Sequence, residues 1–129
     1  MLTAAAVFAA LAGLLHVYIW AMESLVFTSR GRKVFGLSAE QAADERVREL
    51  FYNQGFYNLF LAVGALVGVV LVLTDCAGGR ALVWFTTGSM LGAALVLVTH
   101  NPKMLRGGVV QGTLPLLALA GLAVDALTR

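Results

Sequence analysis

An imidazole and a carboxyl group lie in the first long apolar run of the chain, at His16 and Glu23. Ionisable side chains are costly in hydrocarbon, so those that occur there usually face the interior of a helical bundle and have a task. A carboxyl group and an imidazole that lie close together can serve as a general acid and a general base. Since residues seven apart share a helix face within about 20°, we expect His16 and Glu23 to be the catalytic residues of any site in this protein.

A second set of polar and aromatic side chains could hold the molecule on which these two residues act. Gln54 lies four residues before Asn58, so both side chains are expected on one face of a helix. Gln111 lies near the start of the last apolar run, and Trp20 lies on nearly the same face as Glu23. The expected substrate-binding residues are Asn53, Gln54, Tyr57, Asn58, Gln111, Trp20 and Tyr18.

The composition indicates that a lipid bilayer surrounds much of the chain. Of its 129 residues, 60% are hydrophobic and only 12% are charged, whereas soluble domains carry about 25% charged residues. Each of the four apolar runs reaches about the 20 residues that a helix needs to cross the hydrocarbon core. We therefore expect an all-α protein, an integral membrane four-helix bundle in a single domain over residues 1–129. Its helices should cover about residues 2–27, 39–73, 81–99 and 109–127.

The second helix is expected to begin outside the membrane. Ser38 is followed three residues later by Gln41, which is a capping-box pattern, and acidic residues follow in the first turns, where the helix dipole favours them. No helix breaker separates this start from the apolar run. The sequence thus predicts a solvated extension from about Ala39 and leaves only about residues 29–37 as a loop.

The distribution of basic residues predicts how the helices are oriented. Seven of the nine lysines and arginines fall in the first and third connections, and such an excess marks the cytoplasmic side of a membrane protein. The seven are Arg30, Arg32, Lys33, Arg46, Arg48, Lys103 and Arg106, and the other two are Arg80 and Arg129. We expect a multi-pass protein of the cytoplasmic (inner) membrane with both termini outside.

Depth along the expected helices places the polar side chains on one side of the bilayer. Glu23 lies about one helical turn from the cytoplasmic end of the first helix, given a rise of about 1.5 Å per residue. Residues 53–58 occupy the first membrane turns of the second helix, and Gln111 lies one turn into the fourth. The sequence therefore predicts a polar cavity in the cytoplasmic half of the bundle.

Other features of the sequence carry weaker expectations. Gly64 with Gly68, and Gly88 with Gly92, form two GxxxG pairs, each of which could join helices within one chain or across a homo-oligomer. The single cysteine, Cys76, allows no disulfide within the chain. His16 and His100 are too few to indicate a metal or haem site, and no cofactor is indicated. The basic residues lie in short loops rather than on one face, so no nucleic-acid partner is expected.

The chain resembles the domain-of-unknown-function 1304 family of small four-helix membrane proteins. Three segments carry the resemblance: His16 to Ile19 with Glu23, the Asn-Gln-Gly-Phe-Tyr-Asn run over residues 53–58 that continues to Ala62, and residues 111–115. The resemblance covers nearly the whole chain and implies a four-helix fold. It also implies one site made of His16, Glu23, Asn53, Gln54, Tyr57, Asn58 and Gln111, and no established activity.

Three functions are compatible with these residues. The first is a site for a lipophilic or amphipathic small molecule, with Glu23 and His16 acting on its polar end, and the residues leave open whether such a site only binds or also catalyses. The second is a proton-coupled transporter or channel, which would need an oligomer because four helices are few for a complete path. The third is a membrane scaffold subunit without a small ligand.

Overall fold

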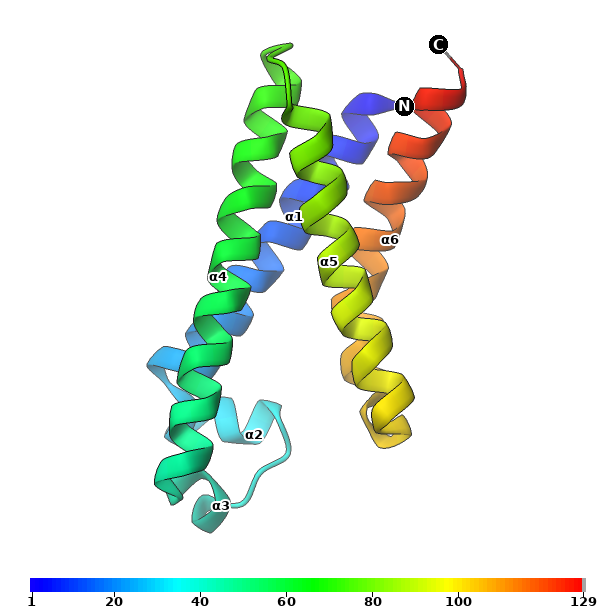
Figure 1. Ribbon diagram of the computed structural model, residues 1–129. Coiled ribbons are helices and arrows are strands. Elements are labelled where there is room, and N and C mark those ends of the chain that lie inside the picture. Colours follow the sequence, from blue (N-terminus) through cyan, green and yellow to red (C-terminus); the bar gives the residue numbers. More distant parts are fainter. Residues whose placement is uncertain (129) are drawn as a thin grey trace. The chain divides into compact units, whose positions relative to one another are not determined.

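Four long helices dominate the computed structural model, which describes residues 1–128. They are α1 (Leu2–Trp20), α4 (Glu45–Leu73), α5 (Gly79–His100) and α6 (Leu105–Leu127) (Figure 1). Each belongs to a segment long and apolar enough to cross a membrane: Leu2–Leu25, Glu45–Leu73, Gly79–His100 and Pro102–Leu127. No strand occurs among the described residues. The predicted all-α fold with four membrane-spanning helices is confirmed.

Short helical pieces fill most of the connections. Two π-helical turns, η1 (Ala21–Leu25) and η2 (Phe27–Gly31), follow α1. They lead into α2 (Arg32–Val34) and α3 (Ala39–Ala43), and a 3₁₀ turn, η3 (Pro102–Met104), precedes α6. The segment predicted as a loop is therefore largely helical.

The start of the second membrane helix differs from the prediction. The capping box of Ser38 and Gln41 is present, but the helix that it begins, α3, ends before Asp44. The Oδ1 atom of Asp44 accepts hydrogen bonds from the backbone N–H groups of Arg46 and Val47. Because an aspartate in this position caps a new helix, α4 begins afresh at Glu45. The fourth helix also begins earlier than predicted, at Leu105.

Contacts divide the chain into two compact units. One consists of Met1–Leu15 together with the chain from Leu61 onward, and the other is His16–Phe60. Helices α1 and α4 each contribute a segment to both units. Arg129, which the sequence analysis counted on the outer side, lies outside the described residues.

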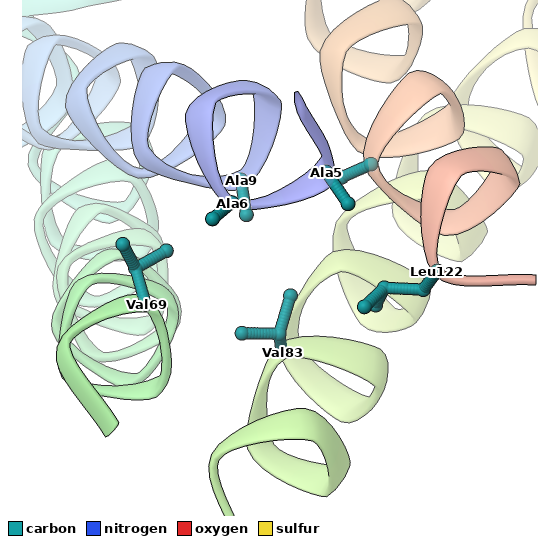
Figure 2. Close-up of a cluster of buried hydrophobic side chains, with 7 residues drawn as sticks. Ala5, Ala6, Ala9, Val69, Val83 and Leu122 are labelled. Carbon is teal, nitrogen blue, oxygen red and sulfur yellow. The ribbon is translucent and has the colours of Figure 1, made fainter. Parts of the chain in front are cut away.

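The first unit is held together by small and branched apolar side chains from four helices. Its larger core cluster joins Ala5, Ala6 and Ala9 of α1 to residues of the other three helices, namely Val69, Val83, Ala118 and Leu122 (Figure 2). A second cluster brings Ala12, Ala65 and Met90 together. Since lipid tails are as apolar as these side chains, close packing of small residues drives such association in membranes.

The two GxxxG pairs behave differently. A Cβ atom on Gly64 would lie 2.7 Å from Thr86, and one on Gly68 would lie 2.9 Å from Val83, so this pair allows α4 and α5 to pack closely. A Cβ atom on Gly88 or Gly92 would meet nothing within 4 Å. Only the first pair packs helices together within the chain.

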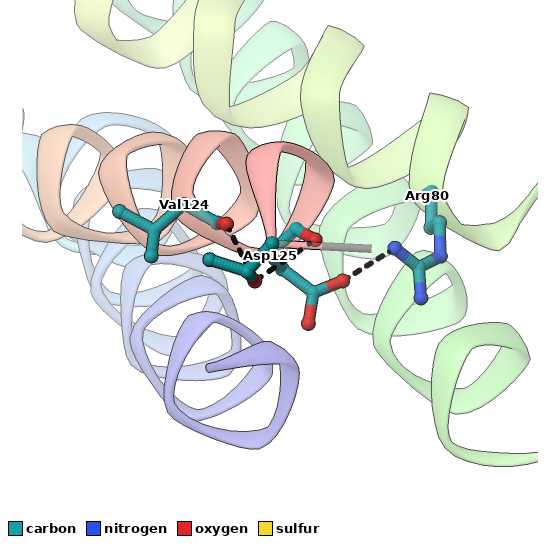
Figure 3. A network of polar contacts seen from close by, with 4 residues as sticks. Arg80, Val124 and Asp125 are labelled. Carbon is teal, nitrogen blue, oxygen red and sulfur yellow. Dashed lines mark hydrogen bonds and ion pairs between the residues drawn. The ribbon is translucent and has the colours of Figure 1, made fainter.

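An ion pair joins α5 to α6 near the ends at which α5 begins and α6 finishes. Nη1 of Arg80 donates to Oδ2 of Asp125 at 2.7 Å (Figure 3). The Asp125 side chain is 13% exposed and that of Arg80 is 35% exposed. The pair neutralises an aspartate close to the end of a membrane-spanning segment, where an isolated charge would be costly.

Candidate functional site

Glu23 lies on a wide turn rather than on a regular α-helix. The N–H group of Val26 donates to the carbonyl of Ala21, five residues back, and that of Gly31 donates to the carbonyl of Val26 in the same way. Between the two π-helical turns, Val26 leaves helical geometry, with φ −127° and ψ 30°. Single π-turns are rare and frequently occur at functional sites.

Two glycines make room for this backbone. A Cβ atom on Gly31 would lie 2.0 Å from the carbonyl oxygen of Met22, so no larger residue fits without moving the backbone. On α4, a Cβ atom on Gly55 would lie 2.1 Å from Oγ of Ser24 and 3.0 Å from Cβ of Glu23. Gly55 therefore allows the turn that carries Glu23 to pack directly against α4.

Asn58 fixes the carboxyl group of Glu23. Its Nδ2 atom donates to Oε2 of Glu23 at 2.7 Å, and the two residues are only 5% and 6% exposed. Nearby, the hydroxyl of Ser24 donates to the backbone carbonyl of Tyr52 at 2.9 Å. Among residues 1–128, no hydrogen bond reaches the second carboxyl oxygen of Glu23, Oε1.

Glu23 lies in the wall of an open cavity of about 580 Å³. Residues of η1 and η2 form one part of the lining, and the first two turns of α4 form the other. The cavity is therefore formed within the second unit alone. The lining residues are Glu23, Ser24, Leu25, Phe27, Thr28, Glu45, Arg48, Glu49 and Tyr52. Glu23 is therefore nearly buried by the protein and is also one of the residues that line this cavity.

The α4 wall of the cavity is a single helix face. Glu45, Arg48, Glu49 and Tyr52 follow the three-and-four spacing that places side chains on one side of a helix. Gly55, which contacts Ser24, continues the same face one turn further on. The cavity thus passes from charged residues at the beginning of α4 to the buried carboxyl group of Glu23.

Stacked aromatic rings stiffen the surroundings of the cavity. Phe27 stacks on Phe51 with ring centroids 4.5 Å apart, and Phe35 lies tilted against Phe51 at 5.2 Å. Trp20 meets Phe56 edge to face at 6.0 Å. These contacts fasten η2 and the segment after α2 to α4, so the two walls hold each other in position.

Comparison with known proteins gives one match. The model of the family described as "Protein of unknown function (DUF1304)" matches residues 10–123. The chain belongs to this family. No curated protein and no solved structure matches the chain.

The family match spans the predicted site residues, and the structure places only part of them together. In this DUF1304 member, Glu23 and Asn58 form one hydrogen-bonded pair. Asn53, Gln54 and Tyr57 are exposed, because the buried face of this part of α4 runs through Gly55 and Asn58 instead. Tyr18 is also exposed, and Gln111 is half-buried on α6, in the other unit.

His16 is fully buried and is not part of the cavity lining. The prediction that it shares a face with Glu23 assumed a regular α-helix over both residues. In a π-turn each residue advances the helix by a smaller angle, so η1 changes the angle between these two side chains, both of which are buried. Acid–base pairing of His16 with Glu23 stays a prediction.

Half-buried Trp20, also predicted to bind substrate, has an unusual indole group. Its Nε1 atom is buried and has no hydrogen-bond partner within residues 1–128. Tryptophan N–H groups usually find a partner when buried. Trp20 does not line the cavity either, so its contribution to binding also stays a prediction.

Several lining residues were not predicted from the sequence. Glu45, Arg48 and Glu49 were taken as part of a solvated extension, although their spacing to Tyr52 could have shown that they share a face with the membrane turns. No sequence signal marks Ser24, Leu25 or Thr28, because the π-turns decide which way they face. Within the described chain, no group of three or more histidine, cysteine, aspartate or glutamate residues could hold a metal ion.

Proposed function

We propose that the cavity binds an amphipathic small molecule and that Glu23 exchanges a proton or a hydrogen bond with its polar end. One observation carries this proposal. A nearly buried carboxyl group has one oxygen fixed by Asn58 and its other oxygen without a partner in the described chain, in the wall of a cavity of about 580 Å³. Small-molecule sites usually have volumes of about 300–1,000 Å³ and a few converging polar groups.

The lining supports an occupant that is polar at one end and apolar at the other. Leu25 lines the cavity and is 60% exposed at the end of the first membrane-spanning segment, so the cavity is continuous with the surface that lipid covers. Phe27 and Tyr52 add aromatic surface, while Ser24 and Thr28 add hydroxyl groups. An apolar chain would lie along Leu25 with its polar end against Glu23.

We further propose that this cavity opens to the cytoplasm and that the membrane is the cytoplasmic (inner) membrane. The cavity begins at the first turn of α4, next to the connection that holds Arg30, Arg32 and Lys33. An excess of basic residues favours the cytoplasmic side. The termini would then lie outside.

The proposal is tested by the small molecules that accompany the purified protein. Wild type, Glu23→Gln and Thr28→Trp would be purified in native lipid particles, with Glu40→Gln, an exposed residue outside the cavity, as the control. Glu23→Gln retains an oxygen that can accept from Asn58, and Thr28→Trp places a large ring at the cavity lining while leaving Glu23 itself unchanged. We expect mass spectrometry to find a species bound to wild type and Glu40→Gln that the other two variants lose. The same species at the same level in all four proteins would contradict the proposal.

A further inference from the structure

The charged residues that line the cavity indicate the charge of the molecule that it binds. Three carboxyl groups, those of Glu23, Glu45 and Glu49, line it together with one guanidinium group, that of Arg48. The lining stays net negative even when Glu23 is protonated, because two carboxylates then still face one cation. This holds although the whole chain has a net charge of +2, so the negative charge is a local property of the cavity.

Glu23, the lining residue that belongs to the first membrane-spanning segment together with Ser24 and Leu25, keeps an acceptor that no described residue occupies. A carboxyl group offers about four acceptor positions, and within residues 1–128 only Asn58 donates to that of Glu23, through Oε2. Desolvation makes an incompletely paired buried carboxylate costly. A ligand that donates a hydrogen bond and carries a positive charge would supply both a further donor to Glu23 and a counter-charge to the lining.

Aromatic surface lies beside this acceptor. Tyr52 and Phe27 both line the cavity, and the Phe27 ring is held by its stack on Phe51. Cations are attracted to the faces of aromatic rings, more strongly where water is excluded. Arg48 opposes a cation, but on the same helix face it lies between Glu45 and Glu49, and both of these carboxylates are in the lining.

The geometry points to a long-chain amine or another cationic amphiphile as the ligand class of this cavity. The inference rests on the proposed function and adds the charge of the polar end. The ammonium group would contact Oε1 of Glu23, near the end of the first membrane-spanning segment. The alkyl chain would leave past Leu25, which is largely exposed.

Three photoreactive probes with the same twelve-carbon chain test the inference. They carry an amine, an alcohol or a sulfate at the polar end, and each would be added to the full-length protein in zwitterionic lipid discs. Peptide mapping gives the labelling of residues 24–28, divided by that of residues 81–99 on α5 to correct for partition into the disc. We expect the amine to label the cavity at least about tenfold more than the sulfate, a ratio that corresponds to about 1.4 kcal/mol.

Substitutions of the lining carboxylates test whether these groups cause the preference for the amine probe. Glu49→Gln should reduce the ratio of amine to sulfate and leave labelling by the alcohol unchanged, and Glu23→Gln should reduce the ratio further. Glu40→Gln, outside the cavity, should keep the wild-type ratio. Saturable cavity labelling that is equal for all three probes, or an amine preference that survives in both Glu23→Gln and Glu49→Gln, would overturn the inference and leave the proposed function standing. Absence of saturable labelling by every probe would overturn both.

Discussion

Glu23 can occupy a membrane-spanning segment because the fold supplies it with both a partner and an opening. Asn58 donates to one carboxyl oxygen at 2.7 Å, and Glu23 also lines the cavity. A carboxyl group in hydrocarbon without either would be costly to keep. The hydrogen bond from Asn58 should therefore stabilise the protein, and Oε1 of Glu23 remains as an acceptor for a ligand.

The stability contribution can be measured with a double-mutant cycle. Asn58→Leu should destabilise the wild type by removing the donor, and should cost less when residue 23 is alanine, because no buried carboxyl group is then left unpaired. We expect a coupling of about 1–2 kcal/mol between the two positions, from unfolding titrations in mixed micelles. Glu23→Gln should have nearly wild-type stability, because it keeps an acceptor for Asn58. Additive single effects would show that the hydrogen bond does not stabilise the protein.

The sequence placed Glu23 and Asn58 in one site, because both are polar groups at similar depth, but it paired Glu23 with His16 and not with Asn58. It did not predict which residues next to Glu23 line the cavity. Ser24 and Leu25 have ordinary side chains, and their position in the wall follows from a backbone turn. Such a turn follows from the three-dimensional packing and has no signature in the sequence.

The π-helical turns are the element on which the site depends. They end the regular helix at Trp20 and direct residues 23–28 toward the first turns of α4. Gly31 permits this path, since even a methyl group there would collide with the backbone of Met22. A backbone oxygen cannot move aside as the end of a side chain can.

Substituting alanine at two different glycines separates the steric requirement for Gly31 from the general effect of replacing a glycine in a helix. Gly31→Ala should destabilise the protein and weaken binding in the cavity, because η1 or η2 must shift. Gly92→Ala is the matched control, since its Cβ atom would meet nothing within 4 Å. It should be neutral or stabilising by up to about 1 kcal/mol, as in other helix interiors. Equal stability and equal thermal midpoints for the two variants would show that Gly31 is not required for the turns.

The elements themselves were largely predictable, and their interruptions were not. Hydrophobic runs indicated four spanning helices, and the Ser38 capping box is present as predicted. The break at Asp44 was missed because the aspartate was interpreted as part of a helix start and not as a new cap. The π-turns were missed because α-helical periodicity was assumed through Phe27.

Over the whole molecule, the two apolar core clusters lie in one unit and the cavity lined by charged residues lies in the other. The buried clusters of the first unit consist of alanine, valine, leucine and methionine, and the buried hydroxyls of Thr86 and Thr87 donate to backbone carbonyls of their own helix. The charged cavity lies in the second unit. The buried clusters of the first unit are apolar, and its ion pair, Arg80 with Asp125, lies near the ends of α5 and α6. The proposal of a one-sided binding site agrees with this arrangement.

Thiol labelling in sealed membrane vesicles tests the central claim, that the segment carrying Glu23 lines a cavity open to the side at which α4 begins. Ser24→Cys, a substitution of similar size, would be made in a Cys76→Ser background and treated with a membrane-impermeant methanethiosulfonate. Ser29→Cys, exposed on η2, is the positive control, and Ser89→Cys on the membrane-spanning part of α5 is the negative control. In the wild-type protein, which has no other cysteine, native Cys76 is exposed in the turn between α4 and α5 and reports the opposite side.

We predict that Ser24→Cys and Ser29→Cys react in inverted vesicles only, that Cys76 reacts in right-side-out vesicles only, and that Ser89→Cys reacts in neither. A folded Ser24→Cys protein that stays unreactive in both kinds of vesicle, while Ser29→Cys is modified, would contradict the account.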